Sequence, residues 1–253
     1  RVRRQRQMCI RDRYIRIASN DFFAVSKDVV SKMIAGELTA AQAYQAFNAK
    51  LLAEEEPADN ETVLTSGKAY SNVFHANGGS AAFSVMANTL RGVYGTDVLL
   101  ATANSFTGSV LQADYNQKMA ASMIMPNGLM SRQRTMTGAE LKETVRAFVE
   151  GCEGGFVPFN RGSLPVVSGI AVEVKEANGS YTLTGITRNG QPLGDGDTVT
   201  VTCLATEKQM EALLASDSGT SAGEDAWVKS TWTDYVSGGK AVLAEPENYM
   251  TLR

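Results

Sequence analysis

Histidine most often carries metal binding and acid–base catalysis at neutral pH, and this chain contains one, His75. His75 lies in a stretch rich in Gly, Asn and Ser, without Asp or other His residues around it. A site that holds two catalytic metal ions needs several such ligands. We therefore expect His75 to be a solvated loop or helix-entry residue. The sequence predicts no catalytic residue, no metal site and no cofactor in this chain.

Cysteine chemistry is equally sparse. Cys9, Cys152 and Cys203 are too few and too widely spaced for a disulfide framework or a zinc site. We expect Cys152 and Cys203 to be buried or partly buried thiols, and a disulfide between them is the alternative. A low cysteine content is compatible with a secreted bacterial protein.

The segment 151–164 contains two other chemically capable residues between glycines, Phe159 and Arg161. An aromatic ring can stack on a ligand, and a guanidinium group can bind an anion. The alternative is a mobile helix-to-strand connection whose rings fold back onto the core. Gly154-Gly155 lacks the Lys and Ser/Thr of a phosphate-binding loop, so a P-loop is not indicated.

Composition is that of an ordinary globular chain, with 43% hydrophobic and 20% charged residues. No apolar run approaches 18 residues, so no membrane span is predicted. Residues 1–13 hold six Arg and one Asp, and they resemble a translated sequencing adapter; we expect them to be disordered. A basic arm for nucleic acid or anionic lipid is the alternative. Without them the formal charge falls from −3 to −8, which argues against a nucleic-acid partner.

Residues 14–54 are expected to be a helical fragment of an upstream module, because so short a segment cannot form a core. Ser26 can cap a first helix that ends at Gly36, and Thr39 with Gln42 has capping-box spacing for a second. Residues 21–52 resemble the C-terminal helices of extracellular solute-binding proteins of ABC transporters. Residues 55–62 are acidic and contain Pro, which indicates a linker.

Residues 63–253 alternate between helical and strand patterns. Ser80 can cap a helix that ends near Gly92 or Gly95, and 97–101 reads as a short buried strand. Residues 137–140, Thr-Gly-Ala-Glu, form a capping box that opens another helix.

Alternating apolar residues predict a strand at 170–174, with turns at Asn178-Gly179 and Asn189-Gly190. A strand at 199–203 has one face of threonines, and helical patterns return at 207–214 and 225–236. The fold class is therefore predicted to be α+β, a mixed sheet with packed helices.

Four strings in this region resemble the C-terminal domain of 5'-nucleotidases, over residues 58–253. They are TDVLLATANSFTGSV at 96–110, TGAELKE at 137–143, VSG at 167–169 and NGQPL at 189–193. Each is short, but they follow the order of the family over about 100 residues. The resemblance implies the fold of that domain.

The resemblance also implies a binding role, because in that family two aromatic rings hold the base while Asn and Arg side chains hold its edge and the ribose or phosphate. Asn104 and Ser105 match the start of the family's Asn-Ser-Gly-Gly-Ile-Arg loop, Gly108 keeps a flexible turn, and Asn127 matches the Asn of Pro-Phe-x-Asn. Ser109 stands where the Arg is expected, and neither ring of the base clamp has a match. The predicted substrate-binding residues are Asn104, Ser105, Gly108, Asn127, Phe159 and Arg161.

We therefore expect a nucleoside- or nucleotide-recognition domain of a 5'-nucleotidase-like hydrolase, itself inactive. Divalent metals would lie in an upstream metallophosphatase domain outside this chain, and the parent would belong to the extracellular space or cell envelope of a bacterium. The alternative is a non-catalytic binding or scaffold module fused to an extracellular solute-binding protein.

Overall fold

The computed structural model describes residues 29–39, 42, 61–75, 78–125, 128–150, 164–178, 180–207, 210, 219–239 and 241–253. The chain divides into two compact units, Arg1–Glu61 and Thr62–Arg253. The composition of the sequence predicted that the second unit begins at residue 63, one residue later. The expectations for residues 1–13, for the Ser26 cap and for Cys152 lie outside the described residues.

The capping box predicted in the first unit is present. The Thr39 N–H donates to Gln42 Oε1 at 3.0 Å, and the Gln42 N–H donates to Thr39 Oγ1 at 3.3 Å. Residues 29–34 are helical, and Gly36 leaves the helix with a φ of 77°. The predicted stop at Gly36 is therefore confirmed, because only glycine adopts this backbone conformation without strain.

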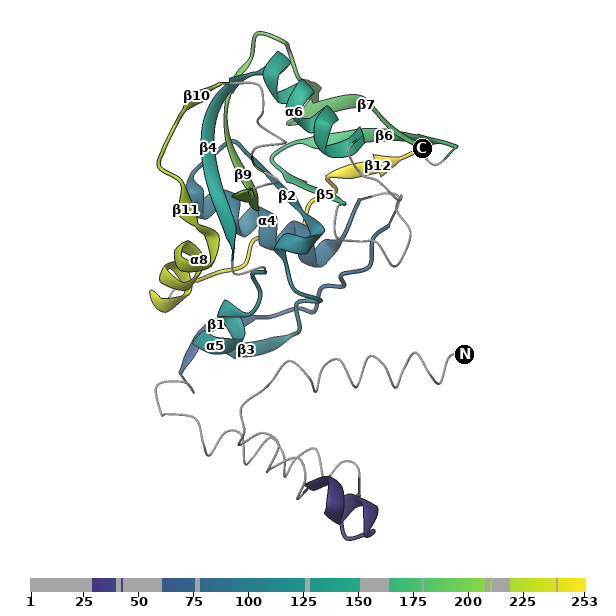
Figure 1. Cartoon of the computed structure of the whole chain (residues 1–253), viewed down its shortest axis with the longest axis vertical. Coiled ribbons are helices and arrows are strands. Elements are labelled where there is room, and N and C mark those ends of the chain that lie inside the picture. The colour runs from purple at the N-terminus through teal and green to yellow at the C-terminus, as the bar shows by residue number, and fades with distance from the viewer. Residues whose placement is uncertain are drawn as a thin grey trace. The chain divides into compact units, whose positions relative to one another are not determined.

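A six-stranded mixed sheet forms the framework of the second unit (Figure 1). β2 and β9 run parallel, whereas β4 and β5 run antiparallel to their neighbours. The sheet order is β10 (Thr220–Ser221), β4 (Leu129–Thr137), β9 (Thr198–Thr206), β2 (Val98–Thr102) and β5 (Pro165–Ser168), and β11 (Ala226–Trp227) also pairs with β4. This mixed sheet, with the helices packed on it, confirms the predicted α+β class.

β9 contains the threonine face that the sequence indicated, which runs from the exposed Thr198 through the half-buried Thr200 to the buried Thr202. β4 and β2 pair with the two edges of β9. The Thr202 and Thr96 hydroxyls share a hydrogen bond of 2.9 Å, and the Thr200 hydroxyl donates to Asp97 Oδ2 at 2.9 Å. The threonines therefore join β9 to the residues that precede β2.

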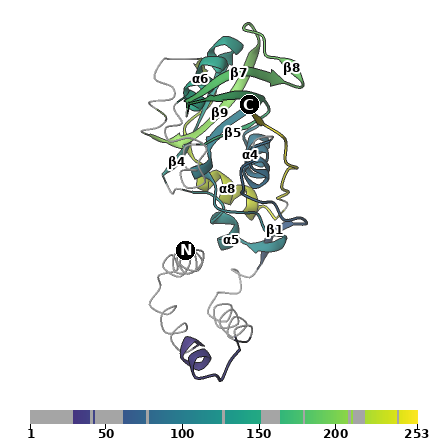
Figure 2. The same cartoon turned by 90° about the vertical axis from the view of Figure 1, so that its right-hand side faces the viewer.

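A second sheet carries the two predicted hairpins, and Figure 2 shows β8 at its margin beside β7. Asn178, Asn189 and Gly190 have positive φ angles of 55°, 52° and 76°, as the turns require. The sheet order is β12 (Met250–Leu252), β6 (Ala171–Ala177), β7 (Ser180–Arg188) and β8 (Gln191–Pro192). β12 pairs in parallel with β6 and was not predicted from the sequence.

The two longest described helices begin at the predicted caps. α4 (Ala81–Tyr94) starts at Ser80, whose Oγ accepts the Phe83 N–H, and ends at Gly95 with a φ of 65°. α6 (Gly138–Glu150) starts with a reciprocal capping box between Thr137 and Glu140, with bonds of 2.7 and 3.2 Å. α4 packs on β2 and β5, while α6 packs on β4 and β7.

Two glycines explain two of the strings that the sequence analysis singled out. A Cβ on Gly138 would lie 1.9 Å from the carbonyl oxygen of Gly194, and one on Gly169 would lie 2.0 Å from that of Asp97. Gly169 also has a φ of 81°. Thr-Gly-Ala-Glu and Val-Ser-Gly therefore mark points where two backbones approach too closely for any side chain.

The last helix begins later than predicted. α8 (Val228–Ser237) starts three residues after Asp225, because Asp225 instead forms an ion pair with Arg132 at 2.6 Å and residues 226–227 form β11. The fully buried Trp232 of α8 donates its indole N–H to the Ala120 carbonyl at 2.7 Å. This bond joins α8 to α5 (Gln117–Ala121), beside the small sheet of β1 (Thr62–Ser66) and β3 (Ala113–Asn116).

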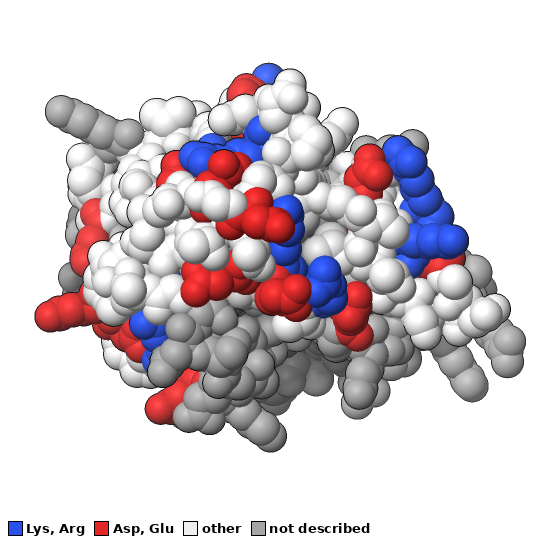
Figure 3. Space-filling model, turned by 90° about the horizontal axis from the view of Figure 1, so that it is seen from above, with Lys and Arg blue, Asp and Glu red and all other residues white. Residues whose placement is uncertain are grey.

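The charged side chains on the face shown in Figure 3 are mixed in sign, with acidic and basic groups lying side by side. Nucleic acid binds to a continuous basic surface, and this face does not present one. Within the described ranges, no helix combines the length and the apolar character needed to cross a membrane.

Candidate functional site at the end of strand β2

The ends of four strands meet at one edge of the six-stranded sheet. β2 and β9 are parallel and end there, and their antiparallel neighbours begin there: Thr102 pairs with Pro165, and Thr206 pairs with Leu129. The connections that leave β2 and β9 and those that enter β4 and β5 therefore start from the same place. We call this the β2–β9 edge.

Asn104 and Ser105 lie at this edge, in the short helix η2 (Ala103–Ser105) that follows β2. The Ala103 N–H donates to the Leu164 carbonyl at 2.9 Å, and the Met125 N–H donates to the Ser105 carbonyl at 3.0 Å. η2 is thus tied to the segments before β4 and β5. Asn104 is exposed, so its amide is available to a ligand while its backbone is held in place.

Ser105 differs from Asn104 because its side chain is fully buried. Its hydroxyl has no hydrogen-bond partner among the described residues. A buried hydroxyl left in that state costs about 1–3 kcal/mol. Ser105 therefore brings a buried hydroxyl group without a described partner to the β2–β9 edge, next to Asn104 in the chain.

The rest of the loop departs from a ligand-binding arrangement. Gly108 has a φ of 58° and open space around its Cα, so the chain turns there as expected. The Ser109 hydroxyl accepts the Asn72 N–H and donates to Asn72 Oδ1, both at 3.2 Å. The position at which the resemblance implies an arginine is therefore occupied by a short side chain with local partners.

Phe106 stands where the resembled family has glycine, and the structure places it in the core. Only 5% of its surface is exposed, and its ring centroid lies 5.9 Å from that of Phe83. A ring held in the core cannot stack on a ligand at the surface. Phe106 therefore does not replace either ring of the base clamp.

Asn127, Phe159 and Arg161 lie outside the described residues, and their predicted roles stay predictions. Their described neighbours in the chain are Gly128, which precedes β4, and Leu164, which precedes β5. Both strands begin at the β2–β9 edge. The structure thus brings Asn104 and Ser105 together and shows that the connections bearing the other three residues enter strands at the same edge.

His75 and Cys203 show no sign of reactivity. His75 is exposed, and its backbone exchanges hydrogen bonds of 2.9 and 3.1 Å with Gly79. Cys203 is a free thiol, and burial raises its pKa to about 12, which confirms the predicted buried thiol and keeps it protonated at neutral pH. Across the described ranges, no three His, Cys, Asp or Glu side chains are grouped to hold a metal ion.

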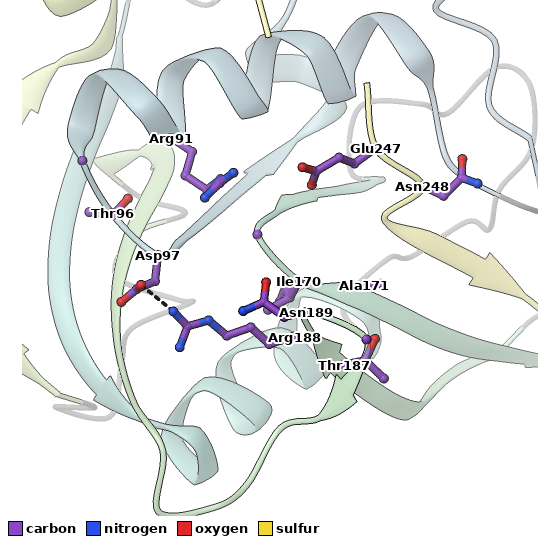
Figure 4. A pocket seen from close by; sticks show the side chains of 13 residues that line it. Arg91, Thr96, Asp97, Ile170, Ala171, Thr187, Arg188, Asn189, Glu247 and Asn248 are labelled. Carbon is purple, nitrogen blue, oxygen red and sulfur yellow. Dashed lines mark hydrogen bonds and ion pairs between the residues drawn. The ribbon is translucent and has the colours of Figure 1, made fainter. Parts of the chain in front are cut away.

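A polar cleft at the opposite edge of the sheet was missed by the sequence analysis. It has a volume of about 470 Å³ and is lined by residues from 91–97, 169–171, 187–190 and 247–248 (Figure 4). These segments are far apart in the sequence and share no motif. The folded chain alone brings them together, so periodicity and spacing could not reveal the cleft.

Solved structures with the same architecture include three hydrolases. The chain matches a 5'-nucleotidase precursor from Thermus thermophilus with a TM-score of 0.57 and 14% identity, over 84% of this chain and 43% of that one. It matches the sulfate thiohydrolase SoxB, also from Thermus thermophilus, with a TM-score of 0.58 and 14% identity, over 86% and 40%. It matches the NAD nucleotidase NadN of Haemophilus influenzae with a TM-score of 0.56 and 18% identity, over 84% of this chain and 42% of that one.

The chain therefore spans less than half the length of each of these proteins. No protein-family model and no curated protein matches the sequence. At such identities the likeness is one of fold. The resemblance of residues 21–52 to solute-binding proteins stays a prediction. The chain has the α+β fold found in the C-terminal domain of 5'-nucleotidases, as the four sequence strings predicted.

Proposed function

We propose that residues 62–253 are the substrate-binding domain of a 5'-nucleotidase-like protein, and that they bind a nucleoside or nucleotide at the β2–β9 edge. The observation that carries the proposal is the exposed Asn104 on a backbone fixed at the end of β2, within the fold of such a domain. A primary amide can donate and accept hydrogen bonds together, as the edge of a nucleobase requires.

The other binding residues would come from connections that enter the same edge. Asn127 would supply a second amide before β4. Phe159 and Arg161, in the segment that leads to β5, would supply a ring for stacking and a cation for a ribose phosphate. These three roles rest on the chain positions of the residues beside β4 and β5.

The proposed binding is weak. Each base stacked on an aromatic ring gains about 1–3 kcal/mol, and Phe106 is packed on Phe83 instead. Ser109 replaces the expected arginine and is engaged with Asn72. We expect Kd values for adenosine and AMP on the order of a millimolar.

Titration calorimetry with adenosine tests this proposal. Asn104→Ala is expected to weaken adenosine binding about tenfold, the effect of losing roughly 1.4 kcal/mol of hydrogen bonding. Asn248→Ala, which removes an exposed amide at the opposite edge of the sheet, is the matched control and should leave binding unchanged. Adenosine binding that is indifferent to Asn104→Ala would contradict the proposed site.

The chemistry of the parent protein would belong to a domain outside this chain. We propose a phosphoesterase of the 5'-nucleotidase type, exported to the cell envelope or beyond, with its divalent metals in an upstream domain. The chain itself, with one histidine, should release no phosphate from AMP when Mg²⁺, Mn²⁺, Zn²⁺ or Co²⁺ is added. Turnover that disappears in His75→Ala would contradict this assignment.

A second candidate is a non-catalytic binding or scaffold module fused to a solute-binding protein. The buried Phe106 and the locally bonded Ser109 favour it, because neither position serves nucleoside recognition. Absence of binding heat from every nucleoside would support this alternative over the first.

A further inference from the structure

The cleft at the opposite edge of the six-stranded sheet has the features of a second binding site. Its volume of about 470 Å³ lies in the range of about 300–1,000 Å³ that is typical of small-molecule pockets. Such pockets are usually lined by apolar groups. This one is lined mainly by charged side chains, amides and glycine backbone, which indicates a strongly polar ligand.

Arg91, at the end of α4, is held in one orientation by a chain of buried groups. Its Nε donates to Ser168 Oγ at 2.8 Å, the Ser168 hydroxyl donates to Asn88 Oδ1, and Asn88 Nδ2 donates to the Glu245 carbonyl at 2.8 Å. Ser168 and Asn88 are 1% and 6% exposed. These bonds use one edge of the guanidinium group, and Figure 4 shows its terminal nitrogens directed into the cleft.

Arg188, at the end of β7, is fixed in a similar way. One of its terminal nitrogens donates to Asp97 Oδ1, while Asp97 Oδ2 accepts the N–H and the hydroxyl of Thr200 at 2.8 and 2.9 Å. Asp97 is thereby held in place and satisfied. Among the described residues the Arg188 guanidinium makes no other hydrogen bond, so the rest of its fork is free to bind.

The two arginines can hold an anion between them, although the formal charges of the cleft balance. The Asp97 carboxylate is committed to Thr200 and Arg188, and the Glu247 carboxylate lies on another rim of the cleft. A phosphate group matches the planar fork of each guanidinium group. Because Arg91 and Arg188 are already oriented, binding would cost little side-chain entropy.

The opposite rim of the cleft presents hydrogen-bond acceptors. Glu247 is exposed there and turned toward the cleft in Figure 4. Its backbone is fixed, because its N–H donates to Ser84 Oγ at 2.8 Å and its carbonyl accepts the Ser84 hydroxyl at 2.9 Å. A carboxylate in this position can accept hydrogen bonds from ligand hydroxyl groups.

We propose that this cleft binds a small phosphorylated polyol, such as a sugar phosphate. The phosphate group lies between Arg91 and Arg188, and the hydroxyl groups bond to Glu247 and to the amide of Asn189. The site is separate from the β2–β9 edge, because its residues precede β2 and follow β5, whereas the edge begins where β2 ends.

Titration calorimetry of the full chain with ribose 5-phosphate, inorganic phosphate and ribose tests the proposal. Ribose 5-phosphate should bind, inorganic phosphate should bind more weakly, and ribose should give no heat. Arg91→Gln should weaken ribose 5-phosphate binding at least tenfold. Glu247→Gln should weaken ribose 5-phosphate binding but leave inorganic phosphate unaffected.

Matched variants separate this site from the rest of the molecule. Arg146→Gln removes an arginine on α6 that pairs with Glu143 outside the cleft, and Asn104→Ala alters the β2–β9 edge; neither should change ribose 5-phosphate binding. If Arg91→Gln lowers the thermal midpoint, Arg91→Lys is used in its place. Lysine keeps the positive charge but lacks the planar guanidinium group that binds phosphate through two nitrogens. No heat from either phosphate, or full binding in both Arg91 variants, would overturn the proposal.

Discussion

Single residues in this protein are constrained most strongly where two backbones meet. Gly138 and Gly169 have no room for a Cβ, and each stands inside one of the strings that carried the resemblance. At these two positions the short strings therefore have a structural reason, the close contact of two backbones. Asn104, the proposed binding residue, is exposed and is not constrained in this way.

Gly138→Ala should destabilise the protein by about 2 kcal/mol or more, because its methyl group would overlap the Gly194 carbonyl. Gly92→Ala is the matched control, since Gly92 lies within α4 and has no neighbour within 4 Å of an added Cβ. It should stabilise by about 0.5–1 kcal/mol through helix propensity. Urea unfolding of both variants measures the contrast, and equal stabilities would show that the close approach is absent in solution.

Asp97 should make stability fall in acid. Hydrogen bonds from Thr200, together with the charges of Arg188 and Arg91, hold the pKa of Asp97 below its ordinary value of 3.8. A carboxyl group with a lowered folded-state pKa stabilises the protein above its unfolded-state pKa, and this contribution is lost as pH falls through the lowered pKa. The loss is therefore expected below about pH 4.

The measurement is the urea midpoint between about pH 5.5 and pH 2.5. Asp97→Asn should lower the free energy of unfolding by about 1–3 kcal/mol at the upper pH. It should also reduce the fall of the urea midpoint below about pH 4, the acid limb of the curve. Asp234→Asn, which alters an exposed residue of α8, is the control and should keep the acid limb. An unchanged acid limb in Asp97→Asn would contradict the role given to this carboxylate.

Elements with a local signal were predicted well. The caps at Ser80 and Thr137 and the turns at 178–179 and 189–190 appear where residue type and spacing placed them. β4 was missed because its centre holds five consecutive polar residues, 131–135, so Leu-Met-Ser-Arg-Gln-Arg-Thr-Met-Thr shows no alternation of apolar and polar residues. β12 was missed because three residues are too few to show the alternation of apolar and polar side chains that predicts a strand. Its pairing with β6 joins segments that are far apart in the sequence.

The capping box of α6 also supports a distant strand. Glu140 Oε2 accepts the Thr137 N–H and hydroxyl, while Glu140 Oε1 accepts the Gly219 N–H at 3.1 Å. Gly219 directly precedes β10. The carboxylate thus joins the start of α6 to β10, the outermost strand of the six-stranded sheet.

Thr137→Ala should cost about 0.5–2 kcal/mol through loss of the cap. Glu140→Ala should in addition accelerate amide hydrogen exchange at Thr220 and Ser221, because it releases Gly219. Glu143→Ala removes a glutamate of the same helix that pairs with Arg146, and it should leave exchange in β10 unchanged. Equal exchange in β10 for the two glutamate variants would contradict the link.

At the scale of the whole molecule, the two proposed binding sites lie at opposite ends of the strands of one sheet. The β2–β9 edge was predictable because the loop after β2 retains Asn104 and Ser105 in a recognisable string. The cleft lined by Arg91 and Arg188, the arginine cleft, was not predictable, because Arg91 lies on α4, which packs on β2, and Arg188 bonds to Asp97 just before β2. The sequence could therefore suggest the loop after β2 as a candidate site, but it could not reveal a cleft assembled from four separate segments.

Residues 62–253 should fold without the preceding unit, since this stretch forms a compact unit with its own core. A chain that begins at Thr62 should keep its thermal midpoint within about 2 °C of the full chain, and deletion of residues 1–13 alone should have no effect. Calorimetry in dilute buffer measures both. A fall of more than about 5 °C, which corresponds to roughly 1–2 kcal/mol, would show that the first unit contributes to stability.

The central claim, that a nucleoside binds at the β2–β9 edge, is tested most directly by amide chemical shifts of ¹⁵N-labelled protein during titration with adenosine. If a nucleoside binds there, the amide signals of Asn104, Ser105 and the described residues nearest the same edge should shift and saturate. The amide signals of Gly190 and Asn248 in the arginine cleft should stay unchanged. Shifts confined to the cleft, or no shift at about 10 mM adenosine, well above the expected Kd, would contradict it.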